Sequence, residues 1–207
     1  MRTDAQDNSQ ICTRRLMPGV GRLRRLVRRM SRNNDGVAAI EFAFIASIMF
    51  TLFIGTVEFS QALTVDRRVT QIASSSADLI ARQKTISTTE IDGVMQIIDH
   101  LMQPYDPSLL SVTVLNVQAS ITNANQTTVC WSYQHNGGAN AYTEGQSYTL
   151  PNSFLEAGNS VIVAEVVYNY EPLIFKHFIR TTFPLRETFY LKPRQSASVD
   201  YNGNKCT

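Results

Sequence analysis

The longest apolar stretch of the chain runs from residue 37 to residue 57. Its twenty-one residues, VAAIEFAFIASIMFTLFIGTV, include a single charged side chain, that of Glu41. An α-helix rises about 1.5 Å per residue, so this stretch reaches roughly 30 Å, the thickness of the hydrocarbon core of a bilayer. The pattern therefore predicts one membrane-spanning helix that is in contact with membrane lipid.

After the span, the pattern changes from continuously apolar to amphipathic. One set of positions recurs at intervals of three and four residues, which is the spacing of one helical face. No proline or glycine falls between Thr56 and Gln83. We therefore expect residues 37–83 to form one transmembrane and extended amphipathic helix. The positions of the packed face are Val65, Val69, Ile72, Ser76, Leu79 and Ile80.

Residues 84–207 predict a small α+β head domain. Ser87 and Glu90 have the spacing of a capping box, and the apolar helical face that follows predicts a helix at about residues 88–102, before Pro104. Later segments rich in β-branched and aromatic residues are typical of strands. The expected strands cover residues 110–114, 129–133 and 161–170, with further edge strands at 186–191 and 197–201.

The expected fold class is therefore α+β. A long N-terminal transmembrane helix continues into a head domain with a second helix and a mostly antiparallel sheet of three to five strands.

Charge is divided unevenly along the chain. Residues 1–36 contain nine arginines and three aspartates, a formal charge of +6, whereas the other residues contain ten basic and fourteen acidic side chains, a charge of −4. Basic segments beside a span stay on the cytoplasmic side. We therefore expect a cytoplasmic leader (residues 1–36), a single pass through the inner membrane and a periplasmic head. Arginine clusters also bind nucleic acid, but topology explains this one better, and no nucleic-acid partner is expected.

Glu41 is the unusual residue of the span. A carboxylate inside a membrane helix costs roughly 2.5 to 3.5 kcal/mol unless its charge is compensated. Glu41 lies five residues after Gly36, near the start of the span. There it either reaches the headgroups with its side chain or pairs with a cation such as a free amino terminus, and that pair is stronger in a low-dielectric medium than in water.

Gly36, Val37, Glu41 and Phe42 together resemble the class III signal of type IV pilins and pseudopilins. That signal has a basic leader and a glycine before an apolar helix with glutamate fifth and an aromatic residue sixth. The segments GVAAIEFAFI, GTVEFSQAL and VDRRVTQIASSSADLIARQ resemble, more specifically, the TadE-like pseudopilins of tight-adherence (Flp-type) pilus systems. The resemblance covers about residues 36–83 and is loose beyond them.

The resemblance implies that a prepilin peptidase cuts after Gly36 and frees the amine of Val37, where many major pilins carry a bulkier Phe or Met. Glu41 would then pair with the amine of a neighbouring subunit. The residues from Asn33 to Gly36 are poor helix formers, which predicts an extended, accessible bond at the cut. Other pilins and pseudopilins and the inner-membrane assembly platform would be partners. The implied function is a structural, non-catalytic minor pseudopilin that helps to start a Flp-type pilus. Whether it is incorporated into the pilus stays open.

Alternatives to this interpretation remain open from the sequence. The chain could be an uncleaved single-pass inner-membrane protein whose periplasmic domain binds a ligand or partner, or a membrane-tethered enzyme. A secretory signal peptide cleaved after Ala62 is a further alternative, although the apolar run exceeds the roughly seven to fifteen residues typical of one. Glu58 lies about 25 Å beyond Glu41 along the helix, either as an end-of-span charge or as a subunit contact.

Cysteine and histidine positions bear on the site chemistry. Cys12 lies in the leader, so Cys130 and Cys206 are the cysteines expected outside the cytoplasm. An oxidising compartment favours a disulfide between them, and two unpaired thiols are the alternative. The three histidines lack metal-site spacing, and no nucleophile or phosphate-binding motif is present. We expect no catalytic residue, no metal site and no cofactor.

The segment from Ile174 to Leu191 is unusually apolar for a connecting region. A membrane-surface or inter-subunit contact would explain this composition. Its large apolar side chains include Phe175, Phe178, Ile179, Phe183 and Phe189.

Overall fold

The computed structural model describes residues 24, 27, 35–137, 142–151, 155–172, 174 and 182–206. Most of the expected leader, with Cys12, lies outside the described residues, and so do Phe175, Phe178 and Ile179. The chain divides into two compact units, residues 1–53 and residues 54–207. Helix α2 (Asp35–Ala81) contributes its first part to one unit and the rest to the other.

In the first unit, residues 36–53 of α2 are exposed to solvent, apart from the half-buried Ala46. The hydroxyls of Ser47 and Thr51 donate to the carbonyl oxygens of Ala43 and Ser47, at 2.8 and 2.9 Å. These polar groups are therefore satisfied within the helix, as a hydrocarbon medium requires. Within the described ranges, α2 is the one helix long and apolar enough to cross a membrane, with a mean hydropathy of 2.3 in its most apolar window. The predicted long apolar helix is confirmed, and it is consistent with single-pass membrane anchoring.

Helix α2 already includes Asp35 and Gly36. The prediction of an extended bond after Gly36 is therefore wrong. A glycine lowers helix stability by only about 1 kcal/mol relative to alanine, and the long apolar helix that follows extends through it.

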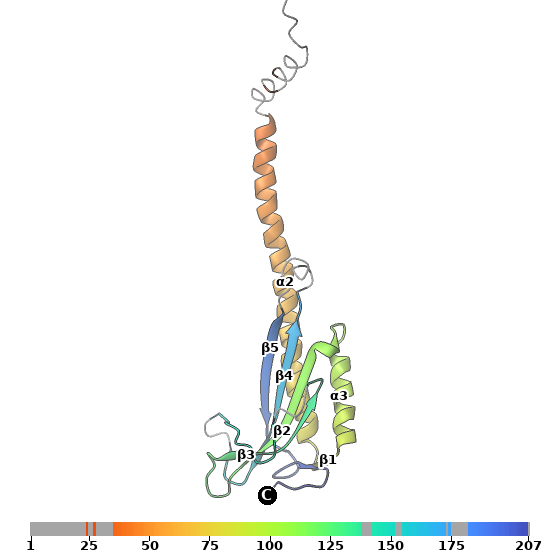
Figure 1. Ribbon diagram of the computed structural model, residues 1–207, viewed down its shortest axis with the longest axis vertical. Coiled ribbons are helices and arrows are strands. Elements are labelled where there is room, and N and C mark those ends of the chain that lie inside the picture. The colour runs from red at the N-terminus through yellow and green to blue at the C-terminus, as the bar shows by residue number, and fades with distance from the viewer. Residues whose placement is uncertain are drawn as a thin grey trace, which may run out of the picture. The chain divides into compact units, whose positions relative to one another are not determined.

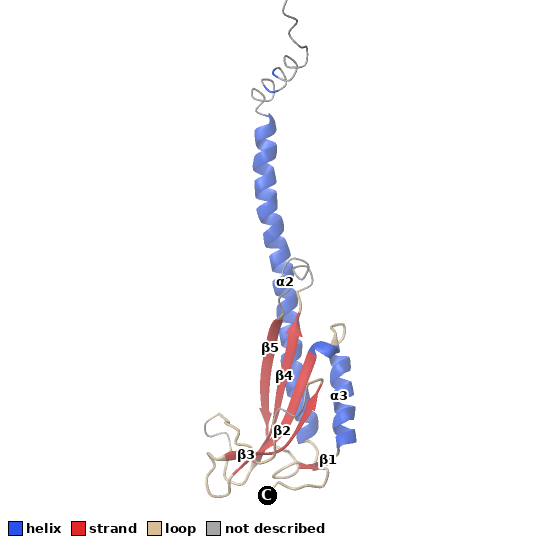
Figure 2. Cartoon of the chain, viewed as in Figure 1, coloured by secondary structure: helices blue, strands red, loops and turns tan. Residues whose placement is uncertain are grey.

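In the second unit, an antiparallel four-stranded sheet packs against two helices (Figures 1 and 2). The strand order is β3-β2-β4-β5, and all three neighbouring pairs are antiparallel. The elements after α2 are β1 (Thr85–Ile86), α3 (Thr88–Met102), the short 3-10 helix η1 (Pro107–Leu109), β2 (Leu110–Ala119), β3 (Thr127–His135), β4 (Ser160–Tyr170), β5 (Phe183–Leu191) and β6 (Asp200–Tyr201). The predicted α+β class is confirmed.

The main core lies between the sheet and the two helices. The face predicted for the second part of α2 is buried, except that Leu79 is half-buried. Strands β2 and β4 also bury apolar side chains on their opposite face, which explains why both read as nearly continuous apolar runs. The core includes Val65, Val69, Ile72 and Ile80 of α2, Ile91, Met95, Ile98 and Met102 of α3, and Val112, Val114, Ala164 and Val166 of the sheet.

Helix α3 has the bounds that the sequence predicts, and its capping box is present. The Ser87 hydroxyl accepts from the Glu90 backbone N–H, and the Glu90 carboxylate accepts from the Ser87 backbone N–H at 2.8 Å. At the other end, the Arg68 guanidinium donates to the carbonyl oxygens of Leu101 (2.9 Å) and Gln103 (2.5 Å). A cation at these carbonyls complements the negative end of the helix dipole. Arg68 therefore joins α3 to α2.

The carboxyl-terminal strand differs from the prediction. Only residues 200–201 of the expected 197–201 strand pair, and they pair in parallel with β1, which was not expected. The pairs Thr85–Asp200 and Ile86–Tyr201 join segments more than a hundred residues apart. A two-residue strand buries too little surface to leave a hydrophobic pattern in the sequence.

Candidate functional site

The residues of the predicted processing signal lie together at the start of α2. Val37 and Phe42 are exposed, with relative exposures of 51% and 72%, and Gly36 and Glu41 are exposed as well. Residues 37 and 41 are separated by one helical turn, so they face the same side of the helix. A carboxylate at position 41 therefore lies within reach of any positive charge created at the backbone nitrogen of residue 37.

Gly36 has no packing role among the described residues. A Cβ atom built there would meet nothing within 4 Å, and its backbone has no positive φ that would require glycine. Alanine would stabilise the helix by about 1 kcal/mol relative to glycine. The fold of the described chain therefore gives no reason for glycine at this position.

The Glu41 side chain is exposed and makes no hydrogen bond and no ion pair with another described residue. The described part of the chain thus supplies no partner for its charge. A partner for this charge therefore lies outside the described residues, and lipid headgroups, water and another polypeptide are candidates.

Glu58 is in a different situation, although it also lies on α2. Its side chain is buried, with 8% relative exposure. The backbone N–H of Ile174 donates to one carboxylate oxygen, and the Tyr170 hydroxyl donates to the other at 3.5 Å. Burial and the nearby Glu58 carboxylate raise the pKa of Tyr170, so its hydroxyl stays protonated and available as a donor. Glu58 thus ties α2 to the end of β4 within one chain, and its role as a subunit contact stays a prediction.

An apolar groove of about 450 Å³ lies beside Glu58. Helix α2 contributes Glu58, Phe59 and Ala62, and the end of β4, the residues after it and the start of β5 contribute the rest of the lining. Among the described lining residues, Glu58 is the one with a carboxylate. The groove is lined by Glu58, Phe59, Ala62, Tyr170, Pro172, Phe183 and Leu185.

The predicted disulfide between Cys130 and Cys206 is present, with 5.4 Å between the Cα atoms. It closes a long loop, because the cysteines are 76 positions apart, and a bridge over such a loop contributes about 4 kcal/mol in the chain-entropy model. The Trp131 indole N–H donates to the carbonyl oxygen of Val199 at 2.7 Å, and its ring stacks on Tyr201 with centroids 5.2 Å apart. These contacts hold the carboxyl-terminal segment against the sheet.

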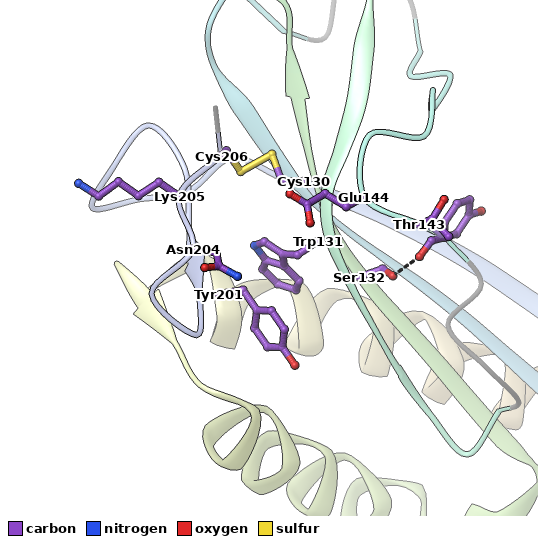
Figure 3. A pocket seen from close by; sticks show the side chains of 10 residues that line it. Cys130, Trp131, Ser132, Thr143, Glu144, Tyr201, Asn204, Lys205 and Cys206 are labelled. Atoms are coloured by element: carbon purple, nitrogen blue, oxygen red, sulfur yellow. Dashed lines mark hydrogen bonds between the residues drawn. A yellow bond between two sulfur atoms is a disulfide. The ribbon is translucent and has the colours of Figure 1, made fainter.

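A cavity of about 340 Å³ lies beside this disulfide. Figure 3 shows Trp131 and Tyr201 next to each other close to the Cys130–Cys206 bond, while the Lys205 side chain is directed away from them. The Ser132 hydroxyl donates to the carbonyl oxygen of Tyr142 at 2.6 Å, and a dashed line from Ser132 marks this bond in Figure 3. Because the two aromatic rings stack on each other, their facing surfaces are closed to a ligand.

Some ionisable side chains elsewhere in the head pair with each other. Glu165 accepts from the hydroxyls of Tyr142 (3.0 Å) and Tyr148 (2.8 Å) on the outer face of the sheet. Burial and this carboxylate raise the pKa of Tyr142 to about 12 and raise the pKa of Tyr148 as well. The Nε2 atom of His135 lies 3.0 Å from the Oδ2 atom of Asp99. In the described ranges no group of three or more His, Cys, Asp or Glu side chains is arranged to hold a metal ion.

Comparison with protein families places one segment of the chain. Residues 36–78 match the family described as TadE-like protein. The match begins at Gly36, extends past Glu41 and Glu58, and ends on the second part of α2, so the resemblance is confirmed for this segment. No curated protein and no solved structure matches the chain. The TadE-like segment thus contains the amino-terminal signal residues and the Glu58 position, and the sheet lies outside it.

Proposed function

We propose that this protein is a minor pseudopilin that takes part in assembly of a Flp-type (tight-adherence) pilus as a structural, non-catalytic subunit. The TadE-like match, which begins at Gly36, supports a role in Tad/Flp pilus-related processes. The observation that carries the finer proposal is the pair Gly36 and Glu41. Neither residue has a role in the fold of the described chain, and both have one if a peptidase cuts between Gly36 and Val37.

In this proposal, the protein enters the inner membrane with its arginine-rich leader in the cytoplasm and its head in the periplasm. A prepilin peptidase removes residues 1–36 and creates a positive amine at Val37. Glu41 then pairs with that amine in a neighbouring pilin or pseudopilin, and Phe42 packs beside the pair. Pairing in the low-dielectric medium favours the correct register of neighbouring helices. The inner-membrane assembly platform is the further partner.

Mass spectrometry of the accumulated protein tests the cleavage. In a host with a prepilin peptidase of this system, we expect the protein to begin at Val37, and Gly36→Val to block the cut. Gly55→Val is the matched control, because a Cβ there also meets nothing within 4 Å and α2 also continues through it. An intact leader on the unsubstituted protein would contradict the proposal and favour the uncleaved single-pass protein. Loss of 62 residues would identify a secretory signal peptide instead.

The role of Glu41 is tested separately. Glu41→Gln removes the charge and keeps the shape, so we expect normal cleavage but reduced co-purification with the other pilins of the system. Thr51→Ala, at another exposed position of the same unit, is the control and should leave co-purification unchanged. Equal co-purification of all three proteins would contradict the pairing of Glu41 with a neighbouring amine.

A further inference from the structure

The apolar groove beside Glu58 exposes hydrophobic side chains to water. Phe59 and Phe183 on its rim have relative exposures of 66% and 52%. The charged group in the lining, the Glu58 carboxylate, is already bonded to Tyr170 and to the backbone of Ile174. The described lining residues of the groove therefore offer a ligand apolar contact and no free charge.

The position of the groove along α2 gives its depth. The apolar run ends at Val57, and its twenty-one residues match the hydrocarbon thickness. Phe59 and Ala62 then lie about 3 and 7.5 Å beyond the end of the run along the helix axis. The headgroup layer on each side of a bilayer is about 5 to 8 Å thick. Both residues therefore fall within this layer when α2 spans the membrane.

The sheet side of the groove lies at the same depth. The bonds from Tyr170 and Ile174 to Glu58 hold the end of β4 beside this turn of α2. Phe183 and Leu185 at the start of β5 pair with Tyr170 and Tyr168 of β4. The next charged residues of α2, Asp66 and Arg67, are exposed and lie about 14 to 15 Å beyond Val57, outside the headgroup layer.

We propose that this groove takes the acyl chain and glycerol region of a phospholipid of the outer leaflet, and so docks the head domain on the membrane surface. Tyrosine and tryptophan are enriched at this boundary, and Tyr170 lines the groove. Segments that lie in the boundary bury phenylalanine side chains in it, and Phe59 and Phe183 supply them here. The internal bonds of Glu58 make the contact feasible, because a carboxylate without partners would be costly to remove from water. The proposal requires only that α2 spans the membrane, so it stands or falls independently of cleavage after Gly36.

Added tryptophans in the full chain, reconstituted in phosphatidylcholine vesicles, test the docking. Dibrominated phosphatidylcholine carries the quencher, with bromines either near the headgroup or near the chain end. Phe59→Trp and Phe183→Trp replace exposed side chains of the rim, and the emission of Trp131, the single native tryptophan, is measured in the unsubstituted protein and subtracted. The matched control is Ile121→Trp, whose position is 80% exposed. Ile121 follows the far end of β2, roughly 30 Å along the strand from the groove.

We expect the tryptophans at positions 59 and 183 to lose most of their emission, more with shallow bromines than with deep ones, at every protein-to-lipid ratio. The tryptophan at position 121 should keep its emission. An Ile48→Trp variant reports insertion of the span, and absence of its quenching would overturn the proposal, because α2 would not cross the bilayer. Unquenched tryptophans at 59 and 183 would also overturn it. So would quenching that disappears as protein density rises, which would identify a second copy of this chain as the occupant.

Discussion

The two parts of helix α2 contain similar apolar residues. They differ in whether those side chains are buried by the rest of the chain. Ile40, Phe44 and Ile48 of the first unit have relative exposures of 59–70%, whereas Val65 and Ile72 of the second are fully buried. The identity of the buried residues in the head is explained by their neighbours in the same chain. In the first unit the described residues leave these side chains exposed, so we expect lipid or other polypeptides to determine their identity.

This difference decides which unusual residues carry functional information. Ser76 is a polar residue on the packed face of α2, and its hydroxyl donates to the carbonyl oxygen of Ile72 at 2.8 Å, which is a sufficient local explanation. Gly36 and Glu41 have no such explanation among the described residues. They are therefore the better candidates for contacts outside the chain.

The same substitution made in both parts of α2 provides the largest expected contrast. Ile72→Ala removes a fully buried side chain and should lower the free energy of unfolding of the head by about 2 to 5 kcal/mol. Ile48→Ala removes an exposed side chain of the first unit and should leave this free energy unchanged. Denaturant unfolding of the full chain in detergent, followed by the fluorescence of Trp131, measures both. Equal destabilisation by the two variants would break the distinction between the two parts.

Substitution of Glu58 tests whether contacts within the head already begin at this position of α2. Glu58→Ala leaves the Ile174 N–H and the Tyr170 hydroxyl without their acceptor, which should cost about 1 to 3 kcal/mol of unfolding free energy. Glu58→Gln keeps an acceptor oxygen of similar shape and should recover part of the loss. The same unfolding measurement applies. If Glu58→Ala is as stable as the unsubstituted protein, the internal hydrogen bonds of Glu58 do not stabilise the head. Glu58 would then resemble Gly36 and Glu41, which we explain by contacts outside the chain, and its predicted subunit contact would gain support.

The sequence predicted the features that depend on local patterns. The bounds of α3 follow from Ser87, Glu90 and an apolar face, and the buried positions of α2 follow from their spacing. The cysteine pair was predicted with its alternative open, because spacing along the chain does not reveal distance in space. The features that sequence reasoning missed join distant segments.

Glu58 illustrates what was missed. Its partners Tyr170 and Ile174 lie 112 and 116 positions away, so neither produces a local pattern around residue 58. The parallel pairing of β1 with β6 has the same cause. One signal was available for the groove, since the unusual apolarity of the segment beginning at Ile174 pointed to an external contact there.

The capping box of α3 provides the smallest and most local test. Ser87→Ala should lower the unfolding free energy by about 0.5 to 2 kcal/mol, because the Glu90 backbone N–H loses its acceptor. Hydrogen bonds from the Ser87 backbone N–H and hydroxyl hold the pKa of Glu90 below its ordinary value of 4.5. The unfolded chain therefore binds more protons near that pH, so the contribution of Glu90 is present above pH 4.5 and is lost as the pH falls through the lower folded-state value.

Glu90→Gln isolates this titration, because glutamine has the same shape and no charge. The unsubstituted protein should be more stable than the variant at pH 7, and the difference should shrink as the pH falls below 4.5, as measured by thermal unfolding at a series of pH values. A difference that does not change with pH would mean that the carboxylate charge contributes nothing to the cap. Because the cap lies wholly within the head, neither variant should alter the mature amino terminus, whereas Gly36→Val should alter it without destabilising the head. Observing both results in the same set of variants would separate residues that serve the fold from residues that serve contacts outside it.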